Sequence, residues 1–203
     1  PEAFIAENAT IIGDVEIGPG VSIWYGAVLR GDVGAIRIGA RSNIQDLACV
    51  HMTTDLSDAV IGEDVVVGHG AIIHGAIIGN GVLVGMGSIL LDNAEIGEQS
   101  IVGAGAVVTA RFKAPARSLI LGSPAKVVRE LTPEQAGAGA QSGLFKDRAD
   151  TPHTRGPPTS GGQLWRAAPT PVSGHARSGG SPDLPQGGVG AIFEQPWAPG
   201  VTW

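Results

Sequence analysis

Large aliphatic residues recur along the first half of this chain at intervals of six positions. They form four series: Ile5, Ile11, Ile17, Ile23 and Leu29; Ile38, Ile44 and Val50; Ile61, Val67 and Ile73; and Ile78, Val84, Leu90, Ile96, Val102 and Val108. An amphipathic helix needs apolar residues about every 3.6 positions and a half-buried strand needs them at every second position, so neither explains a sustained interval of six. The pattern is a hexapeptide repeat.

A hexapeptide repeat predicts a coil in which each hexad is one short strand followed by a corner. The aliphatic residue points inward, and glycine or a small polar residue takes the turn, as in Ile17-Gly-Pro-Gly-Val21. Three hexads close one triangular coil, and successive coils pair through backbone hydrogen bonds about 4.8 Å apart. One coil cannot bury its own apolar face, so stability comes from stacking. The sequence therefore predicts an all-β fold, a parallel β-helix.

The interval is broken in three places. Leu29 to Ile38 is nine residues and Val50 to Ile61 is eleven, whereas Ile73 to Ile78 is only five. Added residues inside the stacked wall would misplace every later inward side chain, so we expect both additions to leave the coil as outward loops. The short interval predicts a tightened corner.

The register places polar side chains in two columns. Arg30, His51 and His74 each follow an aliphatic residue that opens the same face of three successive coils. His69 lies on a neighbouring face, and Asp46 is directly below it in the same column. Two stacked histidines can hold one metal ion between them, but the third points elsewhere within one chain.

Three of the five histidines crowd into 24 residues, which favours a metal site. Three imidazoles with one open position are typical of catalytic zinc. A single histidine on such a coil is more often a surface or interface residue, or a general base as in hexapeptide acyltransferases. Completing the set needs a second copy, and a head-to-tail contact between equivalent faces closes into a ring of three. We expect a homotrimer with three metal sites shared between subunits.

Four segments in this order resemble the signature of gamma-class carbonic anhydrases and their relatives. They are Arg30-Gly-Asp32, residues 38–46, His51, and Gly68-His69-Gly-Ala-Ile-Ile-His74-Gly. The resemblance covers residue 1 to about residue 131. It implies a left-handed coil, although parallel crossovers elsewhere are overwhelmingly right-handed.

The resemblance also implies a site and a reaction. His51 and His74 of one subunit and His69 of the next would bind zinc, with iron or cobalt as alternatives. Zinc held by three neutral imidazoles lowers the pKa of its bound water towards about 7, and the resulting hydroxide would convert carbon dioxide reversibly to bicarbonate. The other candidate residues are the interface ion-pair residues Arg30, Asp32 and Asp46, and the polar residues beside the metal-bound water, Gln45 and Asn43. Gln45 can equally be a ladder amide of the coil, and Arg30 with Asp46 can serve assembly alone.

The sequence departs from the family pattern where protons are shuttled. The family carries a glutamate just after the position of Asp32, where this chain has Val33, and another on an acidic loop. Here that loop, Met52 to Val60, contains Asp55 and Asp58 but no glutamate. Either aspartate can substitute, but a solvated loop carboxylate is the simpler interpretation. Because turnover requires proton release, whether the chain is an active enzyme stays open.

Two alternatives therefore accompany the carbonic anhydrase hypothesis. One is an acyl-coenzyme A thioesterase or acyltransferase-related protein, since Leu121-Gly-Ser-Pro-Ala-Lys126 is shared with hexapeptide acyltransferases. The other is a non-catalytic trimeric assembly subunit.

Composition excludes several partners. The net charge of −6 gives no basic surface for nucleic acid. Cys49 is the only cysteine, so no intrachain disulfide is possible. No stretch reaches the apolar length of a membrane span, and the N-terminus lacks a signal-peptide pattern. We expect a cytoplasmic protein without membrane or nucleic-acid partners.

The repeat is expected to end after Val108. Pro115 to Leu121 should then run back along the prism, and Thr132-Pro-Glu-Gln135 should open a helix. From Gly137, 13 glycines and 9 prolines in 67 residues predict disorder, or a translated frameshift. We divide the chain into a β-helix metal-binding domain, residues 1–131, and a second segment, residues 132–203, with an aborted helix and a Gly/Pro-rich disordered tail.

Overall fold

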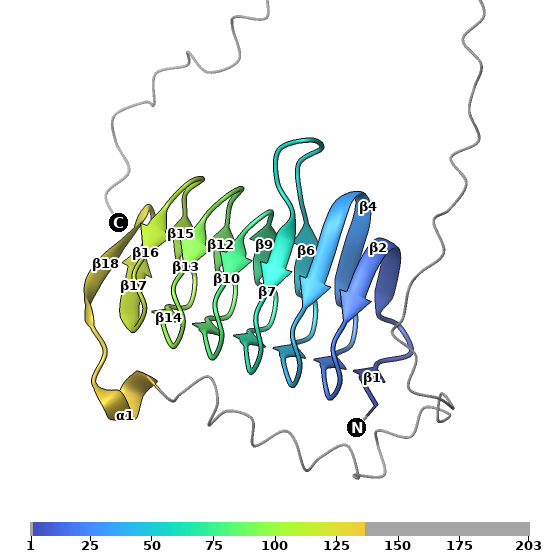
Figure 1. Cartoon of the computed structure of the whole chain (residues 1–203), viewed down its shortest axis with the longest axis horizontal. Helices are drawn as coiled ribbons and strands as arrows, with labels where there is room; N and C mark the ends of the chain where they lie inside the picture. The colour runs from blue at the N-terminus through green and yellow to red at the C-terminus, as the bar shows by residue number, and fades with distance from the viewer. Residues whose placement is uncertain (1, 137–203) are drawn as a thin grey trace, which may run out of the picture. The chain divides into compact units, whose positions relative to one another are not determined.

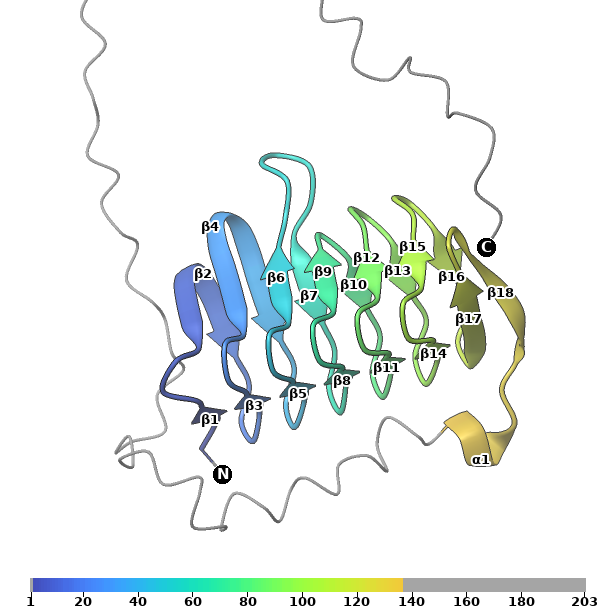
Figure 2. The same ribbon diagram turned by 180° about the vertical axis from the view of Figure 1, so that it is seen from behind.

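The computed structural model describes residues 2–136, which form a β-helix of stacked coils (Figures 1 and 2). Apart from one short helix, α1 (Pro133–Ala136), all regular structure in this range is β. Successive coils pair in parallel, so the predicted fold class is confirmed. The tail predicted from Gly137 lies outside the described residues.

One face of the coil, which we call the β5 face, is a sheet of eight strands that is parallel except for its last pair. In spatial order these are β1 (Phe4–Ile5), β3 (Ser22–Ile23), β5 (Asn43–Ile44), β8 (Val66–Val67), β11 (Leu83–Val84), β14 (Ile101–Val102), β17 (Ser118–Gly122) and β18 (Ala125–Glu130). Most are two residues long because each coil contributes only the straight segment between two corners.

The other two faces belong to one sheet of ten strands because β4 (Val28–Ile38) turns the corner between them. The β6 face contains β6 (Cys49–His51), β9 (Ile72–His74), β12 (Ile89–Leu90) and β15 (Val107–Val108). The β7 face contains β7 (Ala59–Ile61), β10 (Ile77–Ile78), β13 (Glu95–Ile96) and β16 (Lys113–Ala114). β2 (Thr10–Ile17) pairs with β4 along both faces.

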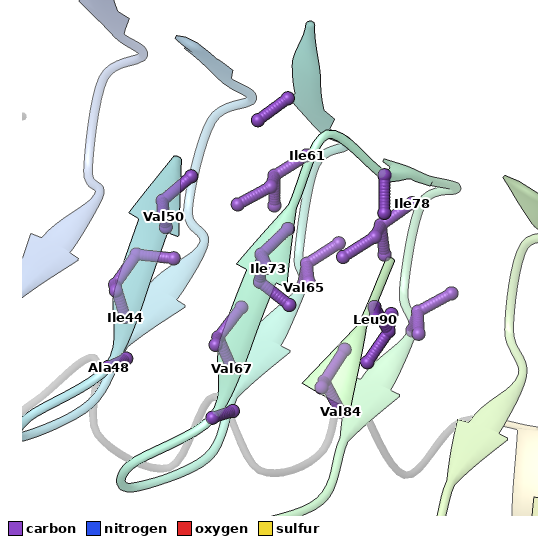
Figure 3. Packing of buried hydrophobic residues seen from close by; sticks show 14 of the residues in the cluster. Ile44, Ala48, Val50, Ile61, Val65, Val67, Ile73, Ile78, Val84 and Leu90 are labelled. Carbon is purple, nitrogen blue, oxygen red and sulfur yellow. The ribbon is translucent and has the colours of Figure 1, made fainter. Parts of the chain in front are cut away.

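The hexad residues fill the interior of the coil, as Figure 3 shows for its central turns. Equivalent residues of successive coils stack through the strand register. These stacks include Ile44, Val67 and Val84; Val50, Ile73 and Leu90; and Ile61 with Ile78, all at most 1% exposed. Complete burial of such a side chain contributes about 1.5–3 kcal/mol. The aliphatic repeat thus supplies the core directly.

The breaks in the repeat have different structures. The eleven-residue interval forms a loop, Met52–Asp58, that projects from the corner between β6 and β7, as predicted (Figures 1 and 2). The nine-residue interval also extends outward, but inside the continuous strand β4 rather than as a separate loop. It remains strand because β2 pairs with it on both sides of the bend. The short interval is a tight corner at Gly75, where φ is +63°.

The prediction that the repeat ends after Val108 and that Pro115 to Leu121 runs back along the prism is wrong. Ala114 and Ile120 continue the interval of six and are 7% and 0% exposed. β16 and β17 accordingly extend their faces in parallel, and only β18 returns, antiparallel to β17. An alanine at a hexad position followed by proline conceals the last coil in the sequence.

The predicted helix opening is present. Thr132 precedes α1, and its backbone NH donates to the side-chain oxygen of Gln135 at 3.3 Å, which is one half of a capping box. Within residues 2–136, no helix is long and apolar enough to cross a membrane. The cytoplasmic location stays a prediction.

Candidate metal centre

His51 and His74 lie one above the other at the end of the β6 face. They are the last residues of β6 and β9, whose parallel pairing sets His51 opposite His74. Their ring centroids are 5.3 Å apart at an interplanar angle of 65°. The predicted column is therefore present, and it also contains Arg30, because Leu29 pairs with Val50 one coil below.

A carboxylate holds one nitrogen of the His74 ring. Nδ1 lies 3.2 and 3.3 Å from the two oxygens of Asp92. The hydroxyls of Ser57 and Thr53 donate to the same carboxylate at 2.6 and 3.1 Å. Partial burial raises the pKa of Asp92, but the hydrogen bonds from Ser57 and Thr53 and the interaction with His74 outweigh it, so the pKa lies below its ordinary value. Asp92 therefore accepts hydrogen bonds as a carboxylate.

His51 is enclosed by a salt bridge within the same chain. Arg30 donates to both oxygens of Asp32 at 2.7 and 2.8 Å. Arg30 also donates to His51 Nδ1 at 3.3 Å, and His51 Nε2 lies 3.2 Å from Asp32. Hydrogen bonding from Arg30 lowers the pKa of Asp32, against a smaller rise from burial and with a further lowering from His51. Both ring nitrogens of His51 are thus engaged.

His69 lies at the corner between the β5 and β6 faces, at the other end of β9 from His74. Its Nδ1 is 2.9 Å from an oxygen of Asp46, the residue predicted to lie directly below it. The side chain of His69 is 53% exposed, against 16% for His51 and 30% for His74. The structure therefore separates His69 from the stacked pair within one chain, as the register predicts.

The two amide residues of the predicted site lie on the β5 face or just beyond it. Gln45 follows β5, and its backbone NH donates to the backbone oxygen of Val67 at 2.9 Å. Asn43 is 8% exposed, and its Nδ2 donates to Ser22 at 2.7 Å. The side-chain oxygen of Asn43 is buried without a partner in the described part of the chain.

Comparisons with known proteins show the family of this chain. The family model described as bacterial transferase hexapeptide (six repeats) matches residues 75–110. A Geobacillus kaustophilus protein named carbonic anhydrase is 51% identical over 130 residues, covering 64% of this chain and 71% of the relative. The chain belongs to the gamma carbonic anhydrase-like family of hexapeptide-repeat proteins.

Other members of this gamma carbonic anhydrase-like family have different names. An Arabidopsis thaliana relative, gamma carbonic anhydrase 1, mitochondrial, is 42% identical over 70% of this chain, which spans only 53% of the relative. The carnitine operon protein CaiE of Salmonella agona is 46% identical over 66% of this chain and 68% of its own length. A solved hexapeptide transferase family protein from Anaplasma phagocytophilum has a TM-score of 0.67 at 45% identity, covering 71% of this chain and 84% of that one.

The loop of this gamma carbonic anhydrase-like chain is anchored at several points. Asp58 accepts the backbone NH of Ala35 at 2.7 Å, which ties the loop to the bend of β4. Asn93 donates to the backbone oxygen of Leu56 at 3.3 Å. Asp55 lies at the loop tip with a φ of +56°. Asp58 therefore has a structural contact, whereas Asp55 carries no such bond in the described part.

A metal would need a second copy of the chain. Within residues 2–136 of one chain, no group of three His, Cys, Asp or Glu side chains is placed to hold an ion. The side chains nevertheless fit zinc. His69 and His74 each turn Nδ1 to a carboxylate, which leaves the lone pair of Nε2 to bind a metal ion. His51 fits only when Arg30 and Asp32 release its ring.

Sequence reasoning missed Asp92 and its hydroxyl partners. The signal was present in the register, since Leu90 pairs with Ile73 and therefore places Asp92 one coil above the corner that follows His74. A search for metal ligands overlooks Asp92 because this residue would not bind the metal itself. It accepts a hydrogen bond from the ring nitrogen of His74 that faces away from the metal.

Proposed function

We propose that this chain is a zinc-dependent, gamma-type carbonic anhydrase that interconverts carbon dioxide and bicarbonate. The observation that carries the proposal is the stacking of His51 on His74 at one end of β6 and β9, with His69 at the other end. This placement supports a site that two copies share. A ring of three copies would contain three such sites.

His51 and His74 of one subunit and His69 of the next would hold the zinc ion. When bound by three neutral imidazoles, zinc supplies a hydroxide nucleophile at neutral pH. Iron or cobalt would suit the same donors. Asp92 and Asp46 keep the hydrogen of His74 and His69 on Nδ1, so that Nε2 of each ring is the donor.

Gln45 and Asn43 would orient the reactants. An amide offers both an acceptor oxygen and an NH₂ donor, so Gln45 can accept a hydrogen bond from the nucleophile or polarise an oxygen of carbon dioxide. Asn43 lies on the same face, but in one chain its unpaired side-chain oxygen is buried, so of the two amides Gln45 is the better placed to contact a reactant.

Arg30, Asp32 and Asp46 would join the subunits. In one chain Arg30 and Asp32 pair with each other over His51, and their side chains are 42% and 38% exposed. Exposed charges at this position can pair with another copy instead, and charge pairs across an interface fix its register. We expect assembly to release the His51 ring for the metal.

The test measures zinc content and hydration rate on the same purified trimer. We expect about one zinc per chain and stopped-flow hydration above the buffer rate. His69→Ala should abolish both, whereas Asp55→Asn should retain the zinc. A trimer that carries zinc but hydrates carbon dioxide no faster than buffer contradicts the proposal.

A second candidate function is acyl-coenzyme A chemistry or assembly without catalysis. Two observations support this alternative. One relative is named carnitine operon protein CaiE and not carbonic anhydrase, and the loop Met52 to Val60 contains no glutamate. Thioester hydrolysis by a trimer inactive towards carbon dioxide would support an acyl-coenzyme A enzyme. Inactivity in both assays would support an assembly subunit.

A further inference from the structure

Asp92 connects the column of Arg30, His51 and His74, which we call the metal-ligand column, to the loop Met52–Asp58. We propose that Asp92 is a positioning residue that fixes the hydrogen of His74 on Nδ1 and, through the same carboxylate, couples the order of this loop to metal binding. The inference rests on the proposed function only for the identity of the bound ion.

The geometry determines the tautomer of His74. Both oxygens of Asp92 lie within 3.3 Å of His74 Nδ1. An ionised carboxylate can only accept, so Nδ1 must carry a hydrogen, and in the neutral ring the lone pair is then on Nε2. Without an acceptor at this position, the ring would be free to hold its hydrogen on Nε2, which cannot then bind a metal until the hydrogen moves.

The loop donates two hydrogen bonds to the same carboxylate. Ser57 donates to Oδ1 and Thr53 donates to Oδ2, so each oxygen is shared between the loop and His74. A shift of either hydroxyl therefore changes the position of Asp92 relative to the ring. The loop reaches the metal-ligand column through these two hydroxyls.

The tight corner at Gly75 makes room for this contact. A Cβ added to Gly75 would overlap the hydroxyl of Ser57 and would lie 2.5 Å from Oδ1 of Asp92. The shortened interval between Ile73 and Ile78 thus places a glycine where Ser57 and Asp92 meet. Gly75, which follows His74, therefore has no room for a side chain unless Ser57 or Asp92 moves.

The test reads the tautomer directly in metal-free protein. Long-range ¹H–¹⁵N spectra of trimer labelled at histidine, recorded at about pH 8 where free imidazole is neutral, identify the protonated nitrogen of His74. The ring is assigned by its absence in His74→Gln. We expect Nδ1–H in the wild type and a shift towards Nε2–H in Asp92→Asn, because the NH₂ of asparagine can donate to Nδ1. Zinc affinity should fall by about 10- to 100-fold in Asp92→Asn.

Ser57→Ala is the matched control, since it removes one loop contact but leaves the carboxylate beside His74. In this variant the tautomer should stay Nδ1–H, amide exchange in the loop should become faster, and zinc should slow that exchange less than in the wild type. The wild-type spectrum tests the proposal even where a variant fails to fold. Nε2–H in the wild type, or an unchanged tautomer and zinc affinity in Asp92→Asn, overturns it. A wild-type trimer that binds no zinc contradicts the proposed function instead, because the tautomer is read without metal.

Discussion

Each of the three histidines meets a carboxylate, but not through the same nitrogen. His74 and His69 turn Nδ1 to Asp92 and Asp46, whereas His51 turns Nε2 to Asp32. Because Arg30 donates to Nδ1 of His51, the hydrogen of this ring is on Nε2 in the single chain. The lone pair of His74 and of His69 is then on Nε2, away from the carboxylate, whereas the lone pair of His51 is on Nδ1 and accepts from Arg30. Arg30 and Asp32 must therefore both release this ring before it can bind a metal. On the proposed function, that difference between the three side chains would make metal binding depend on assembly.

Gly75→Ala tests the crowding beside Asp92. Alanine at a φ of +63° costs about 1–2 kcal/mol in backbone strain, and the added methyl group also displaces Ser57. Gly105→Ala is the matched control, since its φ is +68° and no atom lies within 4 Å of the added Cβ. Urea unfolding should show a larger loss of stability for Gly75→Ala than for Gly105→Ala. Equal losses of unfolding free energy would mean that Ser57 and Asp92 move aside without destabilising the protein.

At this scale the sequence predicted where the three histidines lie better than it predicted the residues that contact them. The register placed His51 opposite His74 and Asp46 below His69, because strand pairing fixes those positions. The register also places Asp92 above the corner that follows His74, but it could not predict the contacts of Asp92 with Ser57 and Thr53, because a loop that leaves the coil has no register. Its hydroxyls find the carboxylate only in three dimensions.

The hexad is the structural unit of the fold, and the two sides of one strand have opposite environments. In β10, Ile78 is 1% exposed inside the coil, whereas its neighbour Ile77 is 43% exposed on the β7 face. Burial follows the interval of six and not the residue type, since both are isoleucine. The repeat therefore encodes the direction of each side chain.

Ile78→Ala and Ile77→Ala test this directly. We expect Ile78→Ala to cost about 2–5 kcal/mol because it leaves a cavity in the stack, and Ile77→Ala to change stability by less than about 0.5 kcal/mol. Chemical denaturation of the two variants measures both values. A comparable loss at Ile77 would show that another copy or segment covers the β7 face.

The elements that sequence reasoning misjudged are those where the chain departs from the hexad. The final coil was missed because Ala114 is too small to mark the interval, although it still points inward. The bend in β4 was expected as a loop, but pairing with β2 keeps it in strand conformation. Hydrophobic spacing predicts regular coils reliably, whereas insertions depend on which neighbouring strand they meet.

For the whole molecule, the central feature of the proposed function is that one chain would hold only parts of the metal site. His74, which stacks on His51, is the last residue of β9, whereas His69 lies in the corner that precedes β9. A ring with head-to-tail contacts brings such unlike parts together at every interface. Metal binding and assembly are then one equilibrium.

Zinc should therefore stabilise the folded trimer by mass action. Protein stripped with a chelator should unfold at a lower temperature, and added zinc should restore the original value, since a ligand that binds only the native state stabilises it. His69→Ala, which lacks one ligand at every interface, should not respond to zinc. Calorimetry of both proteins with and without zinc provides the comparison, and an equal response in His69→Ala would place the ion elsewhere.

The most direct measurement mixes two defective chains. His69→Ala keeps the stacked pair and His74→Ala keeps His69, so neither variant alone can complete a site. In randomly mixed trimers, about one quarter of the interfaces join an intact pair to an intact His69. Zinc content should return to about that fraction of the wild-type value, whereas each variant alone stays at background. Mixed trimers that bind no more zinc than either parent would contradict a site shared between subunits.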